Sequence, residues 1–188
     1  MEMNTSLADN FLESSRYLFR YYKGLADKAM AQIDGNALMH QPDPNSNSIA
    51  LIVKHLSGNM LSRWTDFLTS DGEKPWRQRD EEFEGAYPSK EALLEAWEKG
   101  WQCLFDAIEP LTAADLERIV YIRNEGHTVM EAIQRQIAHY ASHVGQIIFL
   151  AKHLSGEHWQ TLSIPKKGSQ AFNAEKFGQE KQRKHFTQ

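Results

Sequence analysis

The chain has only one cysteine, Cys103, among its 188 residues. A single cysteine cannot form an internal disulfide bond and is typical of a reducing compartment. The sequence also lacks an apolar run near the ~20 residues that a membrane-spanning helix needs. Its first residues, MEMNTSLADNF, are polar and acidic where a signal peptide would be basic and then apolar. These absences predict a cytoplasmic protein without a membrane partner.

An excess of positive charge is missing as well. The sequence has 21 Lys and Arg against 25 Asp and Glu, which gives a formal net charge of -4. A protein of this charge has no general electrostatic attraction to nucleic acid, so no nucleic-acid partner is expected. The composition, 41% hydrophobic and 24% charged, is that of a globular protein. We expect a single domain over residues 1–188, with 156–188 as a C-terminal extension.

Apolar residues recur at helical spacing in four long segments. The predicted helices cover approximately residues 6–33, 48–67, 89–109 and 128–154. Gly35 is expected to end the first helix, whose predicted buried stripe includes Leu18, Tyr22 and Leu25. Four amphipathic helices of this length predict an all-α fold, a four-helix bundle.

Two connections between these helices differ from ordinary short turns. Residues 69–88 have no helical periodicity, and a loop of this length is often a lid or a binding loop. The stretch RIVYIRNEGHTV alternates apolar and polar residues around Asn124 and Gly126. It predicts a small hairpin or an extended strap before the last long helix.

Two histidines stand four residues apart in the last long helix, in QIAHYASHVGQI. That spacing places His139 and His143 on one helix face, where both rings can point at the same ligand. His55 flanks the apolar stripe of the second helix and could complete a three-histidine metal site if the two helices are neighbours. The alternative is that each histidine is a structural or surface residue, since a histidine pair at this spacing often occurs by chance. His127, just before the last helix, is the next candidate.

Other residues have weaker claims to a functional role. The acidic run at residues 80–84 could place a carboxylate near a metal, but a solvated loop is the favoured interpretation. Gln146 could orient a histidine ligand or a bound water. Trp97 and Trp101 are interpreted as core residues, and Cys103 as a buried, unreactive thiol without a basic neighbour.

Two segments together resemble the DinB/YfiT-like family of metal-binding four-helix bundles. They are NSIALIVKHLSGNMLSRW and TVMEAIQRQIAHYASHVGQIIFLAKHL. The resemblance implies that His55, His139 and His143 bind a divalent metal, usually nickel or zinc. It also implies an up-down-down-up helix order, a long crossover between the second and third helices, and homodimers. The later stretch LSIPKKGSQAFN is similar to an extension in a DinB-like subgroup whose activity is unassigned.

Because characterised relatives use small-molecule thiols, the resemblance favours a metal-dependent enzyme, a thiol S-transferase in type, with a low-molecular-weight thiol as cosubstrate. A metal-dependent hydrolase and a non-catalytic, metal-stapled, stress-associated dimer are the alternatives. Small residues on the last helix, Ala138, Ala141, Ser142 and Gly145, suit a homodimer contact or a close approach inside the bundle. In the extension, Ile164 and Pro165 are expected to pack on the bundle, with Phe172 as a further anchor.

Overall fold

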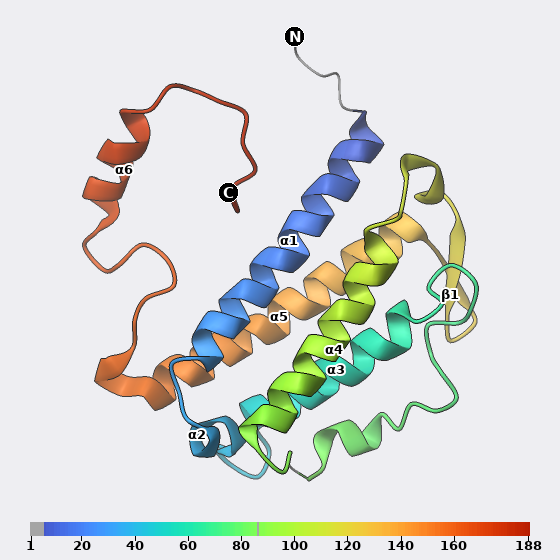
Figure 1. The fold of residues 1–188 in the computed structure, drawn as a ribbon, viewed down its shortest axis with the longest axis horizontal. Coiled ribbons are helices and arrows are strands. Elements are labelled where there is room, and N and C mark those ends of the chain that lie inside the picture. The colour runs from blue at the N-terminus through green and yellow to red at the C-terminus, as the bar shows by residue number, and fades with distance from the viewer. Residues whose placement is uncertain (1–5, 86) are drawn as a thin grey trace.

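The computed structural model describes residues 6–85 and 87–188, which are mainly helical (Figure 1). The helices are α1 (Leu7–Met30), α2 (Gly35–Met39), α3 (Ile49–Trp64), α4 (Lys90–Ile108), α5 (Val129–Ser155) and α6 (Ser169–Phe177). The strands β1 (Ile119–Ile122) and β2 (Glu125–Thr128) form a hairpin directly before α5. Short 3-10 turns lie at η1 (Asp80–Phe83), η2 (Ala113–Asp115) and η3 (Gly156–His158).

The four long helices begin where the sequence predicts, because each start is specified by a local cap. The side chains of Ser6, Ser48, Ser89 and Thr128 each accept a hydrogen bond from a backbone N–H in the first helical turn. Thr128 and Glu131 also form the reciprocal capping box. These contacts satisfy amide groups that the helix itself leaves without a partner.

Helix α3 is buried on nearly all sides. It packs against α4 and α5, while α1 packs against α5 (Figure 1). Gly100 permits the close approach of α4, since a Cβ atom there would lie 3.0 Å from the Cα of Ser57. Trp97 and Trp101 of α4 are fully buried, so their interpretation as core residues is confirmed.

The predicted hairpin is present, and its tip is fixed by the loop that follows α3. Strands β1 and β2 are antiparallel, and the turn residues Arg123 and Asn124 have φ values of 57° and 62°. The Asp71 carboxylate accepts hydrogen bonds from both of their backbone N–H groups, at 2.9 and 2.8 Å. The Gly72 N–H donates to the Tyr121 carbonyl at 2.8 Å. The long loop is therefore packed against the hairpin rather than free.

Two predicted boundaries are wrong. Helix α1 ends at Met30, and Gly35 begins the short helix α2 instead of ending α1. The reason is local: the Asp34 carboxylate accepts a hydrogen bond from the Ala37 N–H at 2.8 Å and starts a new helical turn. Phe67 lies beyond α3, which ends at Trp64.

The C-terminal segment also differs from expectation. It contains α6, and both Ile164 and Phe172 are 41% exposed, so the predicted anchoring through these residues is wrong. Trp159 and Leu162 pack against the core instead. Within the described residues, no helix combines the length and apolar character needed to cross a bilayer.

Candidate metal centre

The structure brings His55 of α3 together with His139 and His143 of α5. One nitrogen from each ring can be chosen so that all three lie within 4.8 Å of one another. The Nε2 atoms of His55 and His139 are 3.2 Å apart. The three ring centroids are separated by 4.8 to 5.2 Å. The three rings therefore lie together, as the family resemblance implies.

Two of the three rings are oriented by hydrogen bonds on the side away from the cluster. Nδ1 of His55 lies 2.9 Å from the Glu82 carboxylate, and Nδ1 of His143 lies 2.8 Å from Oε1 of Gln146. Because these oxygens accept hydrogen bonds, Nδ1 is the donor in each ring, and Nε2 is the nitrogen that can serve as a metal ligand. Gln146 thus has the orienting contact that the sequence suggested for it.

The electrostatic setting keeps the ring nitrogens available as ligands. Burial and the neighbouring rings His143 and His55 lower the pKa of His139 to about 3. Burial also lowers the pKa of His143, although its bond to Gln146 opposes the shift. Neutral imidazoles are the form that binds metal ions.

The donor set fits a divalent metal ion. Nitrogen ligands about 2.0 to 2.1 Å from a tetrahedral ion are roughly 3.3 Å apart, close to the distance between His55 and His139. His143 also offers a ring nitrogen, within 4.8 Å of the nitrogens of His55 and His139. Three imidazoles, two of them oriented by Nδ1 bonds to Glu82 and Gln146, are typical of sites for nickel, zinc and related ions. The cluster could therefore hold a metal ion.

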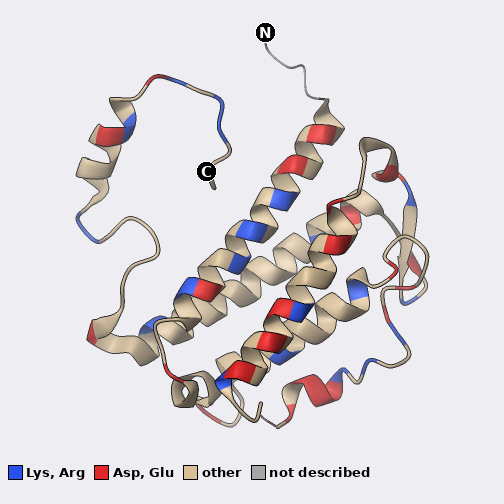
Figure 2. Cartoon of the chain, in the orientation of Figure 1, with Lys and Arg blue, Asp and Glu red and all other residues tan. Residues whose placement is uncertain are grey.

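Glu82 is the main residue that the sequence analysis misjudged. The acidic run at residues 80–84 is drawn in red in Figure 2, and its other acidic members are exposed. Glu82, however, is 6% exposed and also accepts hydrogen bonds from Arg77 at 2.7 and 2.9 Å. Burial opposes ionisation, but the bonds from His55 and Arg77 outweigh it and hold the pKa of this carboxyl below its usual value. Here the solvated-loop interpretation is wrong.

Gly58 makes room for the Glu82 carboxylate beside His55. A Cβ atom at Gly58 would overlap the Glu82 side chain. Since Gly58 lies three residues after His55 on α3, the glycine opens the helix surface next to the histidine. Gly58 is a single glycine among larger residues of the predicted helix, which is a visible sequence signal. The sequence did not indicate which side chain would occupy the space beside it.

A polar stripe on α3 extends the site beyond the histidine. Asn59 and Arg63 follow His55 at intervals of four and are buried with it. Asn59 accepts a hydrogen bond from the Tyr140 hydroxyl, which accepts one from the Trp64 indole, each at 3.0 Å. These contacts fix α3 against α5 beside His139. The four-residue spacing of polar side chains on an apolar helix could have identified both residues.

A cavity of about 400 Å³ opens beside the three rings. Its wall includes Asn59, Gln136 and Phe83, and the Phe83 ring stacks on His55 at a centroid distance of 4.8 Å. His127 lies at the edge of this region, with Nε2 3.3 Å from the Arg135 guanidinium. Among the described residues it is outside the histidine cluster, as are His40, His153, His158 and His185.

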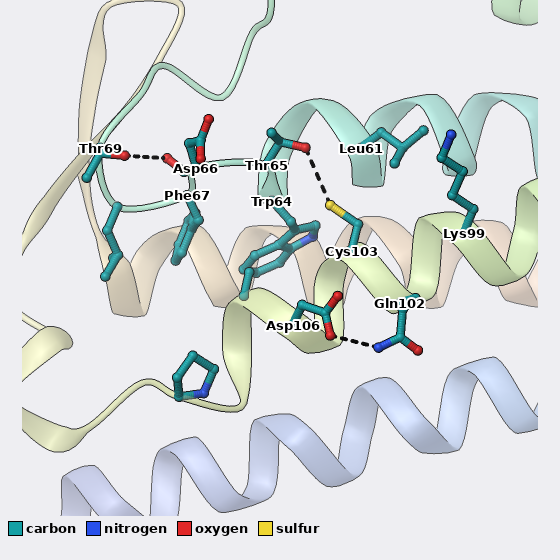
Figure 3. A pocket seen from close by; sticks show the side chains of 13 residues that line it. Leu61, Trp64, Thr65, Asp66, Phe67, Thr69, Lys99, Gln102, Cys103 and Asp106 are labelled. Carbon is teal, nitrogen blue, oxygen red and sulfur yellow. Dashed lines mark hydrogen bonds between the residues drawn. The ribbon is translucent and has the colours of Figure 1, made fainter.

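A larger hollow, about 670 Å³, lies elsewhere, between the end of α3 and α4 (Figure 3). Cys103 lines it, with Sγ 3.5 Å from the Thr65 hydroxyl. The thiol is only half-buried, and Lys99 lines the same hollow one helical turn away. The thiol is therefore less buried than expected, and a basic residue lines the same hollow. The described lining contains no histidine, so this hollow is separate from the metal centre.

The fold and site thus define a mainly helical protein with a three-histidine cluster that could bind a metal ion. The chain belongs to the family described as "Protein of unknown function (DUF1572)", whose model matches residues 6–168. The match covers α1 to α5 and includes the start of the C-terminal extension. No curated protein and no solved structure matches the chain.

Proposed function

We propose that this protein is a metal-dependent enzyme of small-molecule thiol chemistry, a thiol S-transferase in type. One observation carries the proposal: three imidazoles, each offering a ring nitrogen within 4.8 Å of the others, converge at the wall of a cavity of about 400 Å³. That volume lies in the range that takes a small molecule. A purely structural metal site would usually be closed by a fourth protein ligand, whereas a catalytic site keeps a position open.

The residues around the cluster have distinct tasks in this proposal. A divalent ion bound by three neutral ligands would keep its formal charge and favour the thiolate form of a thiol. Glu82 and Gln146 orient two of the rings, and Phe83 covers one face of His55. The amides of Asn59 and Gln136 line the cavity, where they can position a polar part of the ligand.

The proposal includes a DinB/YfiT-like four-helix bundle in up-down-down-up order, with nickel or zinc as the ion. Its support is the direction of the long helices in Figure 1, where α1 and α5 run one way and α3 and α4 the other. The long crossover then lies between α3 and α4 and carries Glu82. We place the protein in the cytoplasm because its one cysteine is typical of a reducing compartment.

We further propose a homodimer formed through the outer face of α5. Ala138, Ser142 and Gly145 are exposed there, and Phe149 on the same face is 72% exposed. A Cβ atom at Gly145 would have no neighbour within 4 Å among the described residues. The small side chains are therefore not needed for packing inside this chain, which favours contact with a second copy.

Thiol binding and turnover by the metal-loaded full chain test the functional proposal. Cobalt-loaded protein titrated with small thiols should develop a thiolate-to-cobalt absorption band and should transfer the thiol to a chromogenic electrophile. His139→Ala should lose both signals while keeping its helical circular dichroism. The control is His153→Ala, an exposed histidine on the same helix.

The remaining outcomes separate the alternatives. Hydrolysis of a chromogenic ester without thiol binding would replace the proposal by a metal-dependent hydrolase. A protein that binds metal tightly, melts at higher temperature with it and shows neither activity would be the metal-stapled dimer.

A further inference from the structure

The cavity beside the histidines is lined by an unusual number of arginines. Arg63 on α3, Arg77 and Arg79 in the loop before η1, Arg123 at the hairpin tip and Arg135 on α5 all contribute to its wall. Four separate segments of the chain thus deliver guanidinium groups to one small space. None of the described residues that line the cavity is acidic.

Part of this positive charge is used to hold the loop and hairpin in place. Glu73 forms ion pairs with Arg63 at 3.2 Å, Arg77 at 3.5 Å and Arg123 at 3.1 Å. Glu82 pairs with Arg77 at 2.7 Å. The side chains of Arg63 and Arg77 are 7% and 2% exposed, so these two have a structural task. Two carboxylates therefore compensate three of the five arginines.

Arg79 and Arg135 have no carboxylate partner within the described part of the chain. The Arg79 guanidinium lies over the Phe83 ring, 5.4 Å from its centroid, and the Arg135 guanidinium has one hydrogen-bond partner among described side chains, the His127 ring. Both side chains are exposed at the cavity, where their donors remain available to a ligand. Five guanidinium groups against two carboxylates leave a surplus of positive charge although the protein as a whole is negative.

The positive charge around the cavity is unfavourable for a site that binds only a metal cation. Cationic side chains beside a divalent ion repel it and lower its affinity, so they contribute nothing to metal retention. An anionic ligand reverses the sign of that contribution. Arginine suits this task because its planar fork binds carboxylate or phosphate oxygens through two parallel hydrogen bonds.

We infer that the substrate of this cavity is a small polyanion, bearing carboxylate or phosphate groups that Arg79 and Arg135 bind while its reacting end reaches the histidine cluster. The inference rests on the proposed function, since it assigns the charge class of the substrate of the same site. The cavity volume of about 400 Å³ favours a small molecule over a polymer. Gln136 adds a polar feature: it is 4% exposed, and its buried carbonyl oxygen has no donor among described residues.

The test compares thiols of similar size that differ in charge. Cobalt-loaded full-length protein is titrated calorimetrically with mercaptosuccinate, which carries two carboxylates, and with uncharged thioglycerol. Mercaptosuccinate should bind at least about tenfold more tightly, because a hydrogen bond to a charged group typically contributes a factor of about ten or more. Raising the ionic strength should reduce this preference.

Arginine variants locate the effect. The preference should disappear in Arg79→Ala/Arg135→Ala and persist in the control Lys176→Ala/Arg183→Ala, which removes two positive charges from the C-terminal segment. Equal affinities for the two thiols would overturn the inference, as would a preference that survives loss of Arg79 and Arg135. Circular dichroism of each variant verifies that the helices are intact.

Anions without a thiol separate this inference from the proposed function. Succinate and inorganic phosphate are titrated into metal-free protein, and whichever binds more tightly identifies the anionic group. If no thiol produces the cobalt band but one of these anions still binds in an arginine-dependent way, the thiol function fails and the polyanion inference stands. If thiols bind the cobalt protein without regard to their charge, the inference fails and the thiol function stands.

Discussion

Replacing Glu82 by glutamine tests whether the carboxylate behind His55 sets the metal affinity of the cluster. The substitution keeps the size of the side chain but removes the charge that holds Nδ1 of His55 at 2.9 Å and the Arg77 guanidinium at 2.7 Å. Loss of such an outer hydrogen bond typically weakens metal binding about 10- to 100-fold, or about 1.4 to 2.7 kcal/mol. We expect Glu82→Gln to fall in this range.

A second effect of the same substitution concerns folding. The side chain of Arg77 is 2% exposed and would keep its charge while losing one of its two carboxylate partners. Leaving a buried charged group incompletely paired costs about 1 to 3 kcal/mol. The metal-free variant should therefore melt at a lower temperature than the wild type, in addition to binding metal more weakly.

Competition with a chelating dye measures the metal affinity, and thermal unfolding in excess chelator measures the stability. Glu84→Gln is the matched control, because Glu84 belongs to the same acidic run and is exposed. The control should change neither quantity measurably. The reasoning is refuted if Glu82→Gln remains folded and binds zinc and nickel as tightly as the wild type.

Three further changes probe the site, its titration and the assembly. Gly58→Ala should displace the Glu82 carboxylate and raise the metal Kd by about tenfold in the dye assay, whereas Gly24→Ala, where a Cβ atom meets nothing within 4 Å, should leave it unchanged. Metal-free protein should lose stability as the pH falls from about 6.5 toward about 3. Over this range His139 is protonated in the unfolded chain but stays neutral in the folded protein, where its pKa is lowered to about 3. Urea unfolding should show a smaller decline in the free energy of unfolding for His139→Gln. Light scattering should give twice the chain mass of 21.6 kDa for the wild type and the single mass for Phe149→Glu, and a monomeric wild type would contradict the proposed dimer.

Features specified within one helical turn were predictable from the sequence. The helix starts at Ser48, Ser89 and Thr128 depend on hydrogen bonds to residues three positions away. The shared face of His139 and His143 follows from helix geometry alone. The position of His55 beside them depends on how α3 packs on α5. The spacing of the histidines does not determine this packing. The expectation that His55 joins the other two came from the family resemblance.

The buried stripe of α1 shows why packing was harder to predict. Leu18, Tyr22 and Leu25 were expected to be buried, but all three are half-buried, and the deeper stripe includes Leu12 and Phe19. That stripe also contains Ser15, which interrupts the apolar pattern. Its hydroxyl donates to the carbonyl of Phe11 at 2.7 Å, so the buried serine is satisfied within its own helix. Because this hydrogen bond lets a serine be buried, the apolar pattern of the sequence did not identify the buried face of α1.

Glu82 could not be placed from composition, because its environment is assembled from distant parts of the chain. It lies 27 residues after His55, in an acidic segment that taken alone favours solvent. Its burial depends on the Arg77 guanidinium, on the space left by Gly58 and on the ring of His55. None of these partners is distinctive in the sequence by itself. Together they provide the pairing and hydrogen bonds that a buried carboxylate requires.

The polar side of α3 is better explained by positioning than by stability. His55, Asn59 and Arg63 are buried in a helix whose other sides pack apolar residues into the core. Removing a charged group such as the Arg63 guanidinium from water costs several kcal/mol, and replacing a buried ion pair by apolar residues is often neutral or stabilising. Their contacts instead position the site. His55 is held by Glu82, Asn59 by the Tyr140 hydroxyl, and Arg63 by Glu73 in the loop that also carries Arg77. The stripe lines the cavity beside the histidines, and such a defined cavity is what the proposed small-molecule site would require.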